Sequence, residues 1–209
     1  MGEIFQNFLQ GFSYDETMDT FEIILSIFLG VGLAAAVGFR VFLPLLILSL
    51  AGYYEVIALN ESWQWIGSLT AVITLAVATL IEIFGYYIPW LDNVLDTIAL
   101  PLATLAGTAV MVATISNLDP TITWALAIIA GGGTAAAVKG NTATARLTSS
   151  TATAGFANPV LTTIETGLAT LMAILSIFVP IVAFALVVFL FLLILRFYKK
   201  LRKKRLSKT

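Results

Sequence analysis

The sequence predicts an all-α, polytopic membrane protein with about six transmembrane crossings. Hydrophobic residues make up 59% of its 209 positions and charged residues only 11%, whereas soluble domains carry roughly 25% charged residues. Several apolar runs also reach the ~20 residues that an α-helix needs to cross the hydrocarbon core. The composition therefore lacks the surface charge that a water-soluble domain requires.

The charge distribution predicts the orientation. Eight of the eleven cationic residues lie between Arg196 and Lys208, directly after a long apolar run. By the positive-inside rule, this places the C-terminus in the cytoplasm, and we expect the protein to be integral to the bacterial inner (plasma) membrane. The basic tail, residues 199–209, is expected to contact the bilayer through anionic lipid headgroups, with no nucleic-acid partner.

The residue types also restrict the chemistry. The chain contains neither cysteine nor histidine, which excludes disulfides, Cys or His metal sites and His-based acid–base catalysis. We therefore expect no cofactor, no metal and no catalytic residue, and we leave a lipid-phosphate enzyme as a third option beside the two functions below.

The N-terminal half begins with an acidic interfacial lead, residues 1–19, before a transmembrane domain over residues 20–198. The first apolar run, residues 20–52, would reach ~50 Å as one helix, so it is either steeply tilted or broken. Gly30, Gly32 and Gly38, followed by Pro44, favour a break near Gly38 to Arg40.

The remaining elements follow in order. After the polar turn LNESWQW, helices are expected at about 66–87 and 95–116, joined by the interfacial corner GYYIPWLDNVLD, with a turn at 117–120. The second half predicts helices at about 121–139, 143–154, 159–178 and 180–198.

An internal similarity suggests a duplication. GLAAAVGFR at 32–40 and GTAAAVKGN at 133–141 share G-x-A-A-A-V and are offset by about half the chain. Repeats over 20–117 and 118–198, each crossing three times, would be inverted, as in many transporters. Both termini would then be cytoplasmic. A homo-oligomer is also considered.

Ionisable groups within apolar runs are costly and tend to face a bundle interior or a wet cavity. Three cations and two carboxylates meet this description, with two more carboxylates at the corner: Arg40, Lys139, Arg146, Glu82, Glu165, Asp92 and Asp96. Glu82 is expected either to be solvated at the interface or to pair with a buried cation. Asp92 is expected to cap the helix that follows it.

The segment at 131–158 carries hydroxyls at helical spacing around Arg146, at Thr142, Ser149 and Thr153. The part from Asn141 onward is too polar to face lipid and, at ~12–16 residues, too short to span it. We therefore expect a re-entrant or discontinuous helix beside a cavity, or else an extramembrane loop. Asn158 should cap the next helix, in which Glu165 would meet Lys139 or Arg146.

Three segments together resemble a family of small, mostly bacterial membrane proteins known only as a domain of unknown function. They are AAAVGFRVFLPLLILSLAG, EIFGYYIPWLDNVLDTIALPLATLAG and RLTSSTATAGFANPVLTTIE. The family's motif positions correspond to Gly38, Arg40, Glu82, Pro89, Asp92, Asp96, Asn158, Pro159, Thr162 and Glu165. The chain departs from the family at Tyr86 and Tyr87, where members carry Asp-Lys, and at Thr166, where they carry Asp. The resemblance covers about residues 22–180 and implies a fold but no substrate.

Two functions are expected from these features. The first is a small transporter or channel with a hydroxyl-lined pathway for a small ion, an anionic solute or a lipid headgroup; the three cations favour the anion. Its pathway or ligand-binding residues would be Arg40, Glu82, Lys139, Arg146, Ser149, Thr153 and Glu165. The second is a non-transporting scaffold or assembly factor that docks partners on its basic tail. A lipid-phosphate enzyme would need a third carboxylate beside Asp92 and Asp96.

Overall fold

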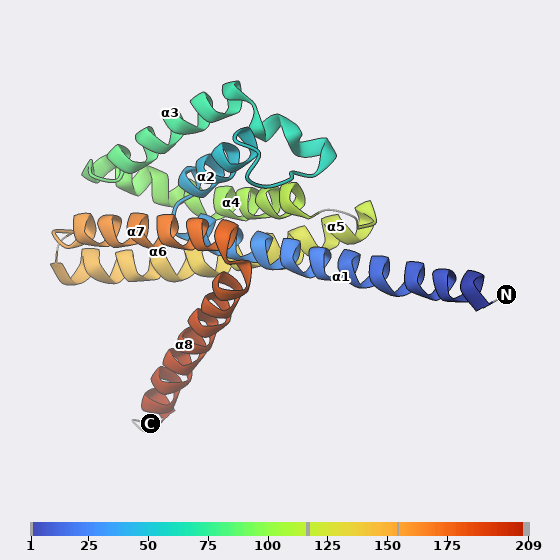
Figure 1. The fold of residues 1–209 in the computed structure, drawn as a ribbon. Helices are drawn as coiled ribbons and strands as arrows, with labels where there is room; N and C mark the ends of the chain where they lie inside the picture. Colours follow the sequence, from blue (N-terminus) through green and yellow to red (C-terminus); the bar gives the residue numbers. More distant parts are fainter. Residues whose placement is uncertain (1, 116–117, 154, 207–209) are drawn as a thin grey trace.

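The architecture is all-α, as predicted. The computed structural model describes residues 2–115, 118–153 and 155–206, and within these ranges it contains helices and no strand (Figure 1). The elements are α1 (Gly2–Phe39), α2 (Phe42–Tyr53), the 3₁₀ helix η1 (Glu61–Gly67), α3 (Leu69–Gly85), α4 (Pro89–Thr114), α5 (Pro120–Leu126), the π-helix η2 (Ala127–Gly132), α6 (Gly133–Thr153), α7 (Asn158–Phe178) and α8 (Pro180–Leu206).

Four helical stretches are long and apolar enough to cross a membrane. They are Thr20–Phe39, Val94–Thr114, Pro120–Thr153 and Asn158–Phe178, and the pair η1–α3, bent by 62°, would be a fifth. The protein therefore has four to five candidate spans in the described ranges. Six crossings and an inverted repeat stay predictions.

The first apolar run is broken where the sequence predicts. α1 ends at Phe39 and α2 begins at Phe42, with Arg40 and Val41 between them. The acidic lead is not a separate element, because its described residues 2–19 continue directly into the rest of α1. The break places a cation and two helix ends inside the bundle, since Arg40 is fully buried.

Gly30 of α1 and the segment that follows α2 lie at the same end of α4. Gly30 on α1 packs against Thr114, in the last turn of α4. After α2, the backbone N–H of Asn60 donates to the carbonyl of Ala113 and its side-chain amide donates to that of Ile115, both at 2.9 Å. α1 and α2 therefore form two helices joined by a break within the bundle, and the chain turns at Arg40.

Small residues allow α1 to lie at the centre of the bundle, where it contacts α4, α6, α7 and α8. A methyl group added at Gly38 would collide with Val138 and lie 2.8 Å from the carbonyl oxygen of Ala135. The two G-x-A-A-A-V stretches thus contact each other across α1 and α6. Gly38 permits this approach to α6 and Gly30 a similar approach to α4, as small residues do between membrane helices.

The prediction of a short, discontinuous helix after GGGT is wrong. α5, η2 and α6 form one helical stretch from Pro120 to Thr153, long enough to span. The glycines allow close packing and do not break the helix: a methyl group at Gly131 would lie 2.6 Å from the carbonyl oxygen of Gly107 on α4. Hydroxyls on α6 return to carbonyls of their own helix, as Thr144 does to Gly140 at 2.8 Å. This satisfies such hydroxyls within their own helix.

The turn that precedes α5 lies partly outside the described residues, at Asn117. Its described part is capped by exposed Asp119, whose side chain accepts from the N–H of Thr121 at 2.8 Å. These backbone hydrogen bonds lower the pKa of the Asp119 carboxyl because they stabilise its ionised form. Pro120 then occupies the first turn, where its missing N–H costs nothing.

α7 and α8 are separate helices. α7 ends at Phe178, Val179 is not helical, and Pro180 begins α8. Phe184 on α8 stacks on Phe28 of α1, with ring centroids 4.2 Å apart. Beyond this contact, α8 leaves the bundle at a steep angle (Figure 1).

Candidate functional site: a buried charge cluster at the broken helix

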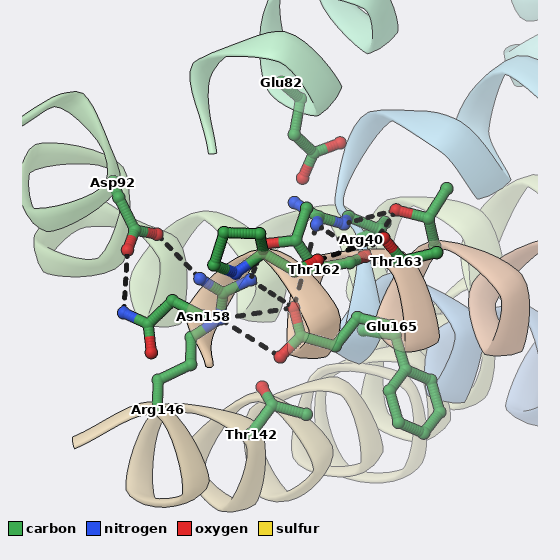
Figure 2. Close-up of polar contacts among 12 residues, drawn as sticks. Arg40, Glu82, Asp92, Thr142, Arg146, Asn158, Thr162, Thr163 and Glu165 are labelled. Atoms are coloured by element: carbon green, nitrogen blue, oxygen red, sulfur yellow. Dashed lines mark hydrogen bonds and ion pairs between the residues drawn. The ribbon is translucent and has the colours of Figure 1, made fainter. Parts of the chain in front are cut away.

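The structure brings together all seven ionisable residues that the sequence singles out. We name them the charge cluster: Arg40, Glu82, Asp92, Asp96, Lys139, Arg146 and Glu165. They come from the α1–α2 junction, α3, α4, α6 and α7. Figure 2 shows five of them: Arg40, Glu82, Asp92, Arg146 and Glu165. Six of the seven are no more than 6% exposed, and Asp96 is partly buried.

Glu82 closes the start of α2. Its two carboxylate oxygens accept from the backbone N–H groups of Val41 at 2.8 Å and Phe42 at 2.9 Å. The N–H groups at a helix N-terminus lack partners within the helix and carry partial positive charge, so a carboxylate there is stabilised. Neither prediction for Glu82 holds: the residue is 5% exposed, and among the described residues its carboxylate has backbone N–H partners and no cation within ion-pair distance.

Lys139 closes the other side of the break. Its Nζ donates to the carbonyl oxygen of Phe39, the last residue of α1, at 3.3 Å. A cation at the negative end of a helix is the electrostatic counterpart of Glu82. Two buried charges of opposite sign therefore hold the two helix ends that the break creates.

Arg146 links α6 to α4 and α7. Its Nη1 donates to Asp92 at 2.6 Å and its Nη2 to Glu165 at 2.6 Å, while Nε also lies 3.1 Å from Glu165. Thr162 accepts a further bond from Nη2 at 3.0 Å. Figure 2 shows Arg146 reaching from α6 between Asp92 and Glu165. The predicted meeting of Glu165 and Arg146 is confirmed.

Asp92 and Asn158 do not act as helix caps. α4 begins at Pro89, earlier than the predicted 95, so Asp92 lies inside its first turn and Ile88 is the capping position. The amide nitrogen of Asn158 donates to Asp92 at 3.2 Å and to Ser150 at 3.1 Å. Both predictions of capping are wrong because these side chains have partners on neighbouring helices.

Arg40 joins the cluster from the break itself. It donates to the carbonyl of Thr162 at 3.1 Å and to the hydroxyl of Thr166 at 3.2 Å, and its Nη2 lies 3.8 Å from Glu165. Thr166, where the resembling family has Asp, is thus a direct partner of Arg40. The departure from the family pattern was the signal for this contact.

Tyr86 is a member that sequence reasoning missed. Its ring, 3% exposed, lies 4.2 Å from the guanidinium carbon of Arg40 and 4.4 Å from that of Arg146. Cations are attracted to an aromatic face, so the ring stabilises both of these like charges. In the sequence, Tyr86 stood out only as a departure from the family pattern.

A cavity of about 330 Å³ opens onto the cluster between α4, α6 and α7. Leu147, 69% exposed, lines its outer part. The lining residues are Asp92, Asp96, Thr97, Ala143, Arg146, Leu147, Ser150 and Asn158. Of the predicted pathway hydroxyls, neither Ser149 nor Thr153 lines this cavity: Thr153 is exposed and bonds to the carbonyl of Ser149. Ser150 provides the hydroxyl.

The cluster contains three cations and four carboxylates. With all seven ionised, it carries one net negative charge. The partial charges of the two helix ends at the break are opposite in sign and offset each other, since one end faces Glu82 and the other faces Lys139. In the described part of the chain, no group of three or more carboxylates is arranged to hold a metal ion, so the third carboxylate that a lipid-phosphate enzyme would need beside Asp92 and Asp96 is not found there.

The comparisons with known proteins give a family without an assigned function. The family model described as "Domain of unknown function (DUF4126)" matches residues 27–200. Neither curated proteins nor solved structures give a significant match.

Proposed function

We propose that this chain, which belongs to the family described as domain of unknown function DUF4126, is a small membrane transporter or channel for a small ion. The observation that carries the proposal is the charge cluster at a broken helix, with a cavity opening onto it. Many transporters place their substrate and ion sites at discontinuous helices inside the bundle.

The energetics support a functional reading of the cluster. Placing one ionised group at the centre of a membrane helix costs roughly 2.5–3.5 kcal/mol on insertion scales. A bundle of this size could pack with apolar residues instead, because replacing buried ion pairs by well-packed hydrophobic residues is often neutral or stabilising. Seven such groups around one break therefore favour a role beyond packing.

The charges favour a different ion from the one the sequence suggested. The sequence favoured an anionic solute or lipid headgroup because of Arg40, Lys139 and Arg146. In the structure these three cations already face carboxylates or carbonyl groups. Arg40 keeps one nitrogen, Nη1, without a hydrogen-bond partner, but the four carboxylates of the cluster outnumber its three cations. The small-ion alternative is therefore the one we adopt.

We also propose five crossings and one re-entrant unit. The crossings are α3, α4, the stretch α5–η2–α6, α7 and α8, and α1–α2 enters and returns on one side. The apolar part of α8, Pro180–Arg196, is 17 residues long, close to the length of a span. If the basic tail is cytoplasmic in a bacterial inner membrane, the N-terminus lies on the opposite face.

Ion flux through the cavity tests the function. Purified protein in liposomes should carry H⁺, Na⁺ or K⁺ down an imposed gradient, as followed with ion-sensitive dyes. Ser150→Trp should abolish this flux because the indole fills the cavity. Thr148→Trp, on the exposed face of the same helix, should not. Protein-free flux rates for all three ions, or equal flux in both variants, would reject the proposal.

The scaffold alternative rests on α8. This helix leaves the bundle (Figure 1) and ends in the basic tail, with Arg196 and Lys199 exposed. Such an arm could dock a partner at the membrane surface. Affinity capture with and without residues 196–209 tests it: a partner lost with the tail, together with the absence of flux, would favour scaffolding.

A further inference from the structure

We infer that the cavity between α4, α6 and α7 binds a small monovalent cation, an alkali-metal ion or a primary ammonium, through oxygen atoms of Asp96, Asn158 and Ser150. This inference names the substrate class of the proposed transporter. The biological role of the bound cation rests on the proposed function, but the binding site does not. Binding itself can be measured without transport.

Asp96 is the carboxylate of the charge cluster that faces neither a cation nor the N-terminus of a helix. Glu82 faces the N-terminus of α2, while Asp92 and Glu165 are bonded to Arg146. Among the described residues, Asp96 has no cation within ion-pair distance. Its Oδ1 is a buried oxygen without a hydrogen-bond partner in the protein.

Asn158 provides a second acceptor of the same kind. Its amide nitrogen donates to Asp92 and to Ser150, and since carboxylate oxygens only accept, this fixes which end of the amide faces Asp92. Oδ1 is then the remaining amide atom, and it too is buried without a protein partner. Both residues line the cavity, so two unsatisfied acceptors belong to one site.

A buried oxygen that accepts no hydrogen bond is stabilised by a bound cation or by a ligand that donates a hydrogen bond. Leaving a buried acceptor unsatisfied costs about 1–3 kcal/mol, and more for a charged group. A ligand that supplies one positive charge also neutralises the single net negative charge of the cluster. The charge count therefore favours a monovalent over a divalent ion. The absence of a three-carboxylate group in the described residues agrees with this.

The size of the cavity sets the form of the ligand. Its volume of about 330 Å³ is roughly ten times the ~30 Å³ that one water occupies in the liquid. A bare ion would not fill it, so the cation enters with part of its hydration shell, or as a small alkylammonium. Arg146 also lines the cavity, but its charge is neutralised by Asp92 and Glu165.

Cation binding to the full chain in detergent tests the inference. Calorimetry and thermal unfolding would use NaCl, KCl and methylammonium chloride, each balanced to constant ionic strength with N-methyl-glucamine chloride. We expect saturable binding and stabilisation by at least one of the three small cations. Asp96→Asn should weaken binding by about 10- to 100-fold, the loss expected for one charged partner. Asp119→Asn, the same change at an exposed helix cap, should bind as the unchanged chain does.

A second readout does not depend on the stability of Asp96→Asn. The chain has no cysteine, so Ser150→Cys places a single thiol in the cavity. The bound cation should slow modification of this thiol by a methanethiosulfonate reagent, with the concentration dependence seen by calorimetry. The inference is overturned if all salts, including N-methyl-glucamine chloride, have the same effect on unfolding and on thiol modification. It is also overturned if Asp96→Asn binds the cation unchanged, which is the result expected for a permanently protonated Asp96. Binding without flux would reject the transport function alone, and flux without binding would reject this inference alone.

Discussion

The carboxylate of Glu82 lies 2.8 Å from the backbone nitrogen of Val41, so a side chain near the end of α3 closes the helix that begins after the break. The second oxygen bonds to Phe42 in the same way. This contact joins two segments 41 residues apart and fixes the position at which α1 and α2 meet. The proposed structure of the break depends on this contact.

Glu82→Gln should destabilise the fold by about 1–3 kcal/mol. Charge-assisted hydrogen bonds contribute about 1.5–3 kcal/mol, and the amide group of Gln would turn a donor toward one of the two N–H groups. Thermal unfolding in detergent measures the effect. Glu61→Gln, at an exposed position in η1, is the matched control and should melt as the unchanged chain does. Equal melting of both variants would contradict the role of Glu82.

Gly38→Ala and Gly140→Ala should act in opposite directions. A methyl group at Gly38 would collide with Val138, whereas a methyl group at Gly140 has nothing within 4 Å. Overpacking costs about 1–3 kcal/mol, and Gly to Ala in an open helical position gains about 0.5–1 kcal/mol. Melting temperatures of the two variants would show whether α1 and α6 pack as closely as described. A stable Gly38→Ala would argue against it.

Arg146→Gln should cost about 3–5 kcal/mol, because it leaves the buried carboxylates of Asp92 and Glu165 without their main partner. The loss should be clearly smaller when Glu165→Gln is already present, since one of the unpaired charges is then gone. A double-mutant cycle on unfolding free energies measures this coupling. Additive losses would mean that the two side chains act independently.

Cysteine accessibility should show Tyr54 and Phe156 on opposite sides of the membrane. Both side chains are exposed, at 70% and 87%, and they lie at opposite ends of the proposed crossings. Tyr54→Cys should react with an impermeant maleimide from outside intact cells, and Phe156→Cys only after the membrane is opened. Labelling of both from the same side would rule out the three crossings proposed between them, which are α3, α4 and α5–η2–α6.

Much of this site could be predicted from the sequence, because the cost of a membrane charge applies whatever the fold. Arg40, Lys139 and Arg146 were identified in that way, and the glycines around Gly38 predicted the break. The shape of the segment after GGGT could not be predicted. The number of polar residues in this segment suggested that water surrounds it. Hydroxyls such as that of Thr144 instead donate to a carbonyl one turn back in their own helix.

The partners of single side chains were also beyond the sequence. Asp92 and Asn158 both precede or begin helices, where capping is the commonest role for Asp and Asn. Tertiary contacts from α6 took precedence, since a buried Arg146 requires a carboxylate more strongly than an exposed helix end does. The contact between Tyr86 and two guanidinium groups needed the fold, because it joins residues from three distant segments.

The most direct test of the ion pathway is chemical block of the cavity in reconstituted protein. Ser150→Cys would be placed in liposomes, and ion flux would be recorded before and after a bulky methanethiosulfonate reagent, with mass spectrometry to confirm complete modification. Thr148→Cys on the exposed face is the control. The account predicts that modification at position 150 stops the flux and that modification at 148 leaves it unchanged. Undiminished flux through a chain fully modified at position 150 would contradict it.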